Sequence, residues 1–174
     1  MEKYKYLSSY VLATVICDLN TIFISRYINF KSRTVDQMDQ AGRSGKQNIA
    51  EGYLQKSLEG RIKLLGVARG SLEELLNDYL DFLRQKGLKL WNQSSPEAQK
   101  VRNLAYKIYK DYNNYKQSFQ PQSGYKIYIR SPEEAANAMV CLINQTNQLL
   151  DQKLRWTEEK FISFPGLKAQ GFVW

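Results

Sequence analysis

Apolar side chains recur every three or four residues through most of this chain, and this spacing limits the fold more than any other feature of the sequence. The clearest run lies in residues 57–86 and comprises Leu58, Ile62, Leu65, Ala68, Leu72, Leu75, Tyr79, Phe82 and Leu83. Ser57 precedes the run and Gly87 follows it, and these residue types are preferred at the two ends of an α-helix. The pattern predicts one long amphipathic helix here.

Four further segments carry the same periodicity, at residues 4–30, 35–54, 96–119 and 132–160. Thr34 and Gln37 have the spacing of a capping box before the second helix, and Ser131 with Pro132 is typical of the start of the last helix. Residues 120–131 contain Pro and Gly and are expected to form a loop. These segments predict helices, and the sequence offers no credible β-sheet.

We therefore expect an all-α fold. The predicted architecture is an up-and-down four-helix bundle with an extra helical segment, in a single domain over residues 1–160. A C-terminal tail at residues 161–174 follows it, rich in Phe, Val and Trp. The tail is too apolar to remain in water, so it either folds back on the bundle or docks on a partner through Phe164, Phe172 and Trp174.

The apolar run Tyr10–Cys17 follows two lysines and superficially resembles a short signal peptide. Asp18 and Asn20 interrupt it at once, and the helical pattern continues to Phe30. We expect this segment to be a core helix that is too polar to span a membrane. Cys17 and Cys141 each lie within an apolar helical pattern, which favours free thiols in the cytoplasm over a disulfide.

The sequence has no histidine, which excludes imidazole-dependent triads and His-containing zinc sites. Four carboxylates lie at helical spacing in the third helix and are the best alternative for a metal: Glu73, Glu74, Asp78 and Asp81. Because Lys and Arg lie nearby, an exposed acidic helix face is the better interpretation. We expect no metal, no cofactor and no enzymatic activity.

Small residues crowd the middle of the second helix, including Gly42, Gly45 and Ala50, and they lower its intrinsic helix propensity. Close packing of helix backbones would compensate, and Gly66, Ala68 and Gly70 offer small residues on the next helix. The two helices are expected to form an antiparallel pair. A phosphate-binding loop at Ser44-Gly45-Lys46 lacks the required flanking residues.

Glu51 lies among these small residues, and Arg69 lies close to the apolar face of the third helix. This placement suggests an ion pair between them that sets packing specificity. We therefore group six residues as an assembly and packing set: Gly42, Gly45, Ala50, Glu51, Arg69 and Gly70.

The chain is basic, with 25 Lys and Arg against 17 Asp and Glu, a formal net charge of +8 and a pI of about 9.4. Residues 91–120 interleave cations with tyrosines, a combination that can hold phosphates and stack bases. Alternatively, the tyrosines pack on the bundle and the lysines only keep the surface soluble. The candidate nucleic-acid-binding residues are Arg33, Arg43, Lys46, Lys100, Arg102, Lys107, Lys110, Lys116, Lys126 and Arg130.

Two segments carry a family resemblance: residues 42–52, Gly-Arg-Ser-Gly-Lys-Gln-Asn-Ile-Ala-Glu-Gly, and residues 67–75, Val-Ala-Arg-Gly-Ser-Leu-Glu-Glu-Leu. In these the chain resembles the bacterial four-helix-bundle family that includes proteins encoded in ribosomal-RNA intervening sequences. The family also includes the accessory variability determinant of diversity-generating retroelements. The added segment at residues 91–130 and the tail look like the longer variant of this family, which carries a C-terminal suffix.

The resemblance implies a four-helix protomer that assembles into a ring, typically a pentamer, with a basic surface for nucleic acid. In the retroelement branch the ring also binds a reverse transcriptase and its template RNA. We therefore expect a non-enzymatic accessory protein that binds structured RNA or an RNA–DNA hybrid, serves a reverse transcriptase and does not act at a membrane. The alternative is an oligomeric protein–protein scaffold whose positive charge is incidental.

Overall fold

The computed structural model describes residues 3–112 and 128–163. Within these ranges the protein is all-helical and has no strand, which confirms the predicted fold class. A short 3-10 helix, Lys3–Tyr6, precedes five α-helices: α1 (Ser8–Tyr27), α2 (Thr34–Leu54), α3 (Leu58–Gln85), α4 (Pro96–Tyr112) and α5 (Pro132–Ser163).

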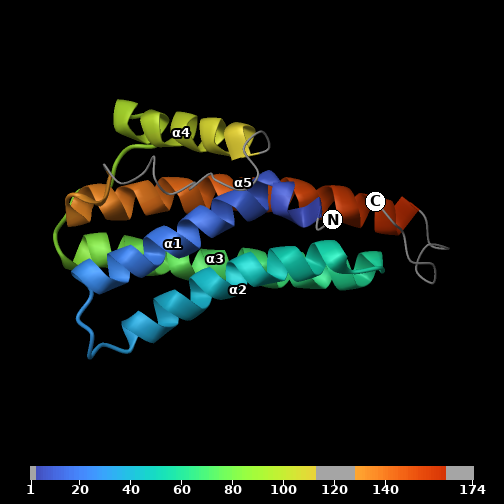
Figure 1. Ribbon diagram of the computed structural model, residues 1–174, viewed down its shortest axis with the longest axis horizontal. Coiled ribbons are helices and arrows are strands. Elements are labelled where there is room, and N and C mark those ends of the chain that lie inside the picture. Colours follow the sequence, from blue (N-terminus) through green and yellow to red (C-terminus); the bar gives the residue numbers. More distant parts are fainter. Residues whose placement is uncertain (1–2, 113–127, 164–174) are drawn as a thin grey trace.

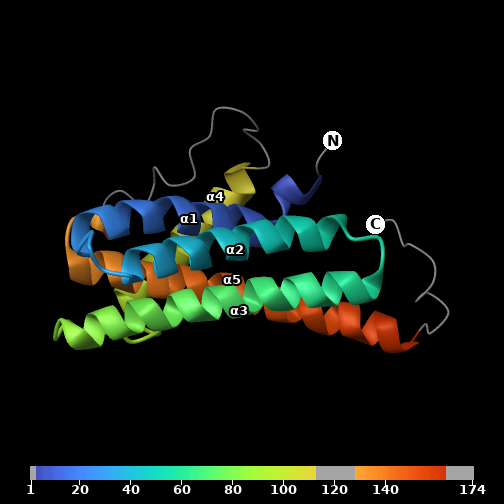
Figure 2. The same cartoon turned by 90° about the horizontal axis from the view of Figure 1, so that it is seen from below.

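Four of the helices, α1, α2, α3 and α5, run along a common long axis (Figure 1). Each contacts two of the others, because α2 packs on α1 and α3 while α5 packs on α3 and α1. Figure 2 shows α2 and α3 joined at one end and running antiparallel, as the sequence predicts. α4 lies outside this group, against α5 and α1.

The core forms where the apolar stripes meet. On α3 the fully buried positions include Leu72, Leu75 and Tyr79, which the helical period identifies in the sequence. Fully burying one large apolar side chain contributes about 1.5–3 kcal/mol. α4 joins the same core through a narrower stripe, made of Ala98, Val101, Ala105 and Ile108.

The predicted ends of α3 and the start of α5 are confirmed. The Ser57 hydroxyl accepts a hydrogen bond from the Gly60 N–H at 3.1 Å, and the Ser131 hydroxyl accepts one from the Glu134 N–H at 3.2 Å. Gly87 has a φ of 65°, in the left-handed region that glycine adopts without a steric penalty. Its position stops α3 because the Leu88 N–H turns back to the Leu83 carbonyl.

The helix predicted over residues 35–54 is confirmed to within one residue as α2, but its predicted N-terminal cap is wrong. Thr34 is its first helical residue, and Arg33 in the capping position already has a helical backbone, with φ −59° and ψ −22°. A side-chain cap requires an extended backbone at that position, so the Thr34–Gln37 capping box does not form. The observed helix α1 is also shorter than the helix predicted over residues 4–30, because the backbone is extended at Leu7 and at Ile28. Predicted helical residues 113–119 lie outside the described ranges.

The small residues of α2 do pack closely against neighbouring helices. A Cβ on Gly45 would lie 2.7 Å from Leu72 Cδ2, and one on Gly42 would lie 3.2 Å from the Asn20 side-chain nitrogen. Both glycines are buried. The side chain of Leu72 already occupies the space of a Cβ at position 45, and a Cβ at position 42 would force Asn20 to shift by a few tenths of an ångström.

The expectation for Gly66 and Gly70 on α3 is wrong. A Cβ at either position would meet nothing within 4 Å, and both residues are exposed. Each residue of an α-helix is rotated by about 100° from the last. Leu65, Ala68 and Leu72 take the buried face of α3, which turns the two glycines outward.

α1 is long and apolar enough to cross a membrane by length and composition, which differs from the expectation based on Asp18 and Asn20. Half of its most apolar stretch is buried inside the protein. A helix at the centre of a protein core has the same composition, and α1 packs against α2, α4 and α5. Asn20 is 1% exposed and lies within that core.

Candidate nucleic-acid interface

The exposed face of α4 brings together three of the predicted cations. Lys100, Lys107 and Lys110 are all exposed, and their spacings of seven and three residues place them on one side of the helix. Four small or branched apolar residues anchor the opposite side of α4 in the core. The sequence dictates this division, because cations and apolar residues alternate with the helical period.

Two tyrosines accompany these cations. Tyr106 is 57% exposed and packs edge-on against Tyr109, with ring centroids 5.2 Å apart. Burial, and then Tyr106, raise the pKa of the Tyr109 phenol, so its hydroxyl keeps its proton. An exposed ring beside lysines, such as that of Tyr106, offers a surface on which an unpaired base can stack. Full packing of these tyrosines on the core, the alternative interpretation of this segment, does not hold for Tyr106.

Arg102 differs from the three lysines of α4. It is half-buried, and its guanidinium donates to the Gln93 carbonyl at 2.6 Å and to the Gln99 side chain at 3.0 Å. These bonds fix the connection that precedes α4. Arg102 therefore positions α4 and is a weaker candidate for phosphate contact than its neighbours.

A second basic group lies on α2, where Arg43 and Lys46 line a hollow of about 310 Å³ together with Tyr10 and Cys17 of α1. The Lys46 ammonium lies 6.0 Å from the centroid of the Tyr10 ring. Arg43 lies 3.7 Å from the Asp39 carboxylate, which offsets part of the positive charge. This hollow combines cations with an aromatic ring but is less basic than α4.

The two basic groups lie on opposite sides of α1 in Figure 1, α4 above it and α2 below it. Arg33, at the start of α2, and Arg130, before α5, are both exposed. Lys116 and Lys126 lie outside the described residues, as do the predicted docking residues Phe164, Phe172 and Trp174. The structure therefore groups Lys100, Lys107 and Lys110 in one place and Arg43 with Lys46 in another.

The predicted ion pair between Glu51 and Arg69 is wrong. Arg69 donates to Asp151 of α5 at 2.8 Å and to Glu73 on its own helix, whereas Glu51 is exposed and accepts from Gln47. Glu73 also accepts from Asn147 of α5 at 3.4 Å. Arg69 faces α5 because its position on α3 is rotated away from α2.

The carboxylates of α3 do not gather into a metal site. In residues 3–112 and 128–163, no three Cys, Asp or Glu side chains lie close enough together to hold a metal ion. Burial, then Asp81 and Glu74, raise the pKa of the Asp78 carboxyl. Asp81 itself accepts a hydrogen bond from Arg84 at 2.8 Å.

Both cysteines are free thiols, as expected. Burial is the main cause that raises the pKa of each thiol above its ordinary value, and nearby cations oppose it, Lys46 at Cys17 and Arg102 at Cys141. A thiol that keeps its proton is a poor nucleophile. Cys141 therefore serves as a small core side chain, and the half-buried Cys17 is part of the wall of the hollow beside Lys46.

Two partly or fully buried cations, Arg61 of α3 and Lys153 of α5, were not among the functional residues predicted from the sequence. Arg61 is 2% exposed, and Lys153 is half-buried and lies 4.3 Å from the centroid of the Trp156 ring. The signal for Arg61 was its position three residues after Leu58 and four before Leu65, on the apolar face of α3. For Lys153 it was the spacing to Trp156 and Lys160, which places all three on one face of α5.

The fold and these surfaces define an all-helical protein with a basic face on α4 and a smaller basic hollow between α1 and α2. Comparison of the chain with models of protein families, with curated proteins and with solved structures gives no match.

Proposed function

We propose that this protein is a non-enzymatic nucleic-acid-binding accessory protein that binds structured RNA or an RNA–DNA hybrid. The observation that carries the proposal is the exposed surface of α4, where Lys100, Lys107 and Lys110 lie on one side of the helix and the ring of Tyr106 is also exposed. Lysines bind phosphates as flexible point charges, and the phenol ring offers a stacking surface for a base. Binding of this kind tolerates many sequences and depends strongly on salt.

We propose further that α1, α2, α3 and α5 form an up-and-down four-helix bundle, with α4 added outside it. The pairwise packing of these four helices supports this. From the family resemblance of residues 42–52 and 67–75 we also propose assembly into a ring, typically a pentamer, in the cytoplasm. Gly42 and Gly45 belong to packing within the protomer, whereas exposed Gly70 and Glu51 are available to a second subunit.

The same resemblance leads us to propose a reverse transcriptase as the protein partner. In this role the ring holds the template RNA and the polymerase together, and the protein contributes surfaces without chemistry of its own. The test is purification of the tagged protein from its host at low salt, with and without nuclease. A reverse transcriptase and a defined RNA recovered together support the role, and a clean oligomer that recovers neither contradicts it.

A charge-reversal pair tests the face on α4. The test variant carries Lys100→Glu, Lys107→Glu and Lys110→Glu, and the matched control carries Lys56→Glu, Lys63→Glu and Lys86→Glu, all at exposed positions. Fluorescence anisotropy measures the affinity for a structured RNA as a function of salt. We expect the test variant to lose at least about tenfold in affinity and to flatten the salt slope by about 2–3.

The control variant has the same net charge, so it separates a local contact from overall attraction. Circular dichroism checks that both variants remain helical. Equal losses in the two variants would show that the face on α4 is not the binding surface.

A second candidate function is an oligomeric protein–protein scaffold. Two large apolar side chains favour it, because Phe30 is 83% exposed and Ile162 is 75% exposed. Such residues contribute to interfaces between proteins. A scaffold keeps its partner at high salt and after nuclease treatment, whereas a complex bridged by RNA does not.

A further inference from the structure

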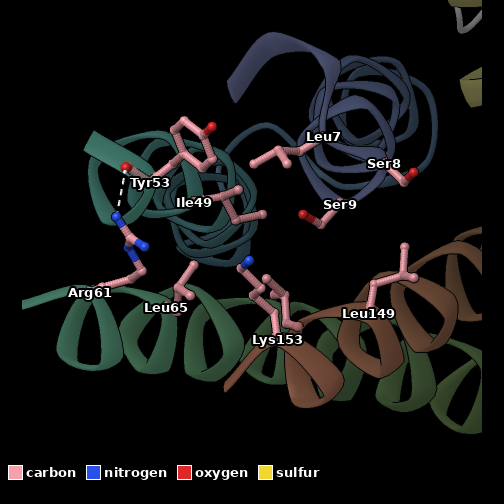
Figure 3. Close-up of a pocket in the computed structure, with 10 residues that line it drawn as sticks. Leu7, Ser8, Ser9, Ile49, Tyr53, Arg61, Leu65, Leu149 and Lys153 are labelled. Atoms are coloured by element: carbon pink, nitrogen blue, oxygen red, sulfur yellow. Dashed lines mark hydrogen bonds between the residues drawn. The ribbon is translucent and has the colours of Figure 1, made fainter. Parts of the chain in front are cut away.

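A cavity of about 160 Å³ lies where the start of α1, the end of α2, the start of α3 and the second half of α5 meet (Figure 3). Its floor is buried and apolar, since Ile49, Leu65 and Leu150 are 1%, 4% and 1% exposed. Leu7 and Leu149 line it at half-buried positions, so the cavity reaches the surface beside α1 and α5. A cavity of about 150 Å³ holds a molecule of the size of benzene. The size and the floor of this cavity therefore suit one phenyl ring.

The chain that follows α5 is apolar and begins with a turn signal. Residues 164–174 lie outside the described ranges, and their sequence contains Phe and Trp side chains but only one charged side chain, Lys168. Pro165 and Gly166 stand near the start of this segment, and this dipeptide is typical of a turn. Residues 113–127 also lie outside the described ranges, but they lead to the start of α5, whereas the cavity lies beside its second half. The tail is therefore the segment that starts nearest to the cavity along α5.

The distance from the end of α5 to the cavity decides which residue of the tail can enter it. Lys153 and Leu149 line the cavity, and α5 continues from them to Ser163. At 1.5 Å per helical residue, the cavity lies about 15–21 Å from the end of the helix. Phe164 is the next residue and cannot cover this distance, because an extended chain advances at most about 3.6 Å per residue. Phe172 lies further along the tail, where an extended chain spans about 30 Å from Ser163.

We propose that the tail folds back along α5 and that the phenyl ring of Phe172 enters the cavity. The ring packs on the apolar floor and is removed from water, which is the driving force for docking. A neutral ring needs no charged partner from Arg61 or Lys153, which belong to the polar part of the wall. The indole of Trp174 is larger than a benzene ring, so Phe172 is the aromatic residue that fits in both reach and size. This docking goes beyond nucleic-acid binding, because it does not involve the basic face of α4.

Thermal unfolding of the full chain, followed by circular dichroism, tests the docking. Phe172→Ala should lower the Tm by at least about 3 °C, because it removes a ring from an apolar site. Phe164→Ala is the matched control in the same tail. It should shift the Tm by less than about 1 °C, because Phe164 cannot reach the cavity. The proposal is overturned if Phe172→Ala causes no shift, or if Phe164→Ala causes an equal or larger one.

Filling the cavity from its own wall locates the ring. The hydroxyl of Ser9 points into the cavity (Figure 3), so Ser9→Leu places an apolar side chain in the space proposed for the ring. In this background Phe172→Ala should shift the Tm by less than about 1 °C. In a Thr21→Leu background, changed at an exposed position of the same helix, Phe172→Ala should keep its full shift. Equal shifts in the two backgrounds would place the ring on another surface and overturn the proposal.

Benzene gives a second readout that needs no change in the wall of the cavity. Phe172→Ala leaves a space of the size of benzene open, so benzene should bind to this variant and raise its Tm. In the wild type and in Phe164→Ala the ring of Phe172 already occupies the space, so benzene should raise the Tm by less. An equal rise in all three proteins, or no rise in Phe172→Ala, would show that Phe172 does not fill the cavity.

Discussion

The hydroxyl of Tyr79 on α3 donates a hydrogen bond of 2.7 Å to the side-chain oxygen of Asn20 on α1, and both side chains are buried. The amide nitrogen of Asn20 donates in turn to the Met38 carbonyl on α2 at 2.8 Å. One asparagine therefore connects three helices. Phe23 packs edge-on against the Tyr79 ring, with centroids 4.8 Å apart. Burial raises the pKa of Tyr79 well above its ordinary value, so the phenol stays a donor.

Tyr79→Phe should destabilise the protein by about 1–3 kcal/mol, because it leaves the buried Asn20 oxygen without its donor. Urea denaturation followed by circular dichroism measures the loss. Tyr106→Phe is the control, since its phenol is exposed and should change the free energy of unfolding by less than about 0.5 kcal/mol. Similar effects of the two changes would mean that the bond to Asn20 adds no net stability.

Gly45→Ala should destabilise the protein by about 1–3 kcal/mol, because the new Cβ would lie 2.7 Å from Leu72 in a packed core. Gly70→Ala is the matched control on the neighbouring helix. Its Cβ would meet nothing within 4 Å, so the higher helix propensity of alanine should stabilise the protein by up to about 1 kcal/mol. Thermal unfolding of both variants checks these opposite signs, and a shared sign would contradict the packing argument.

Asp151→Asn should lower the free energy of unfolding by up to about 1 kcal/mol, because it removes the charge that Arg69 pairs with across α3 and α5. The pair is partly exposed, so the effect should shrink in about 1 M salt. Glu51→Gln should have no effect, since Glu51 does not pair with Arg69. Denaturation at two salt concentrations tests this, and a larger loss for Glu51→Gln would restore the pairing expected from the sequence.

Lys153 should make the protein more stable as pH rises from about 8 toward 10.5. Its pKa is lower in the folded state, so in this window the unfolded chain binds more protons and the free energy of unfolding increases with pH. Lys153→Met removes this contribution, so wild type should gain stability relative to the variant across the window. Paired denaturation curves at pH 7, 8, 9 and 10 measure the difference, and a constant difference would contradict the lowered pKa.

The positions of the helices follow from the sequence alone. The three- and four-residue spacing of apolar side chains marks α3, and Ser57 and Gly87 mark its ends, because capping and periodicity depend on residues within one turn of each other. The same local logic explains the exposed lysines of α4, because the helical period alone fixes which residues of a helix share its polar face.

Only the tertiary structure decided which faces meet. Arg69 has Glu51 and Asp151 as possible partners by charge, and the rotation of α3 between α2 and α5 selects Asp151. The same rotation turns Gly70 away from α2. The cavity beside Lys153 needs residues from four separate helices, so no local pattern contains it. Periodicity sets which residues share a helix face, but packing between distant segments sets what that face contacts.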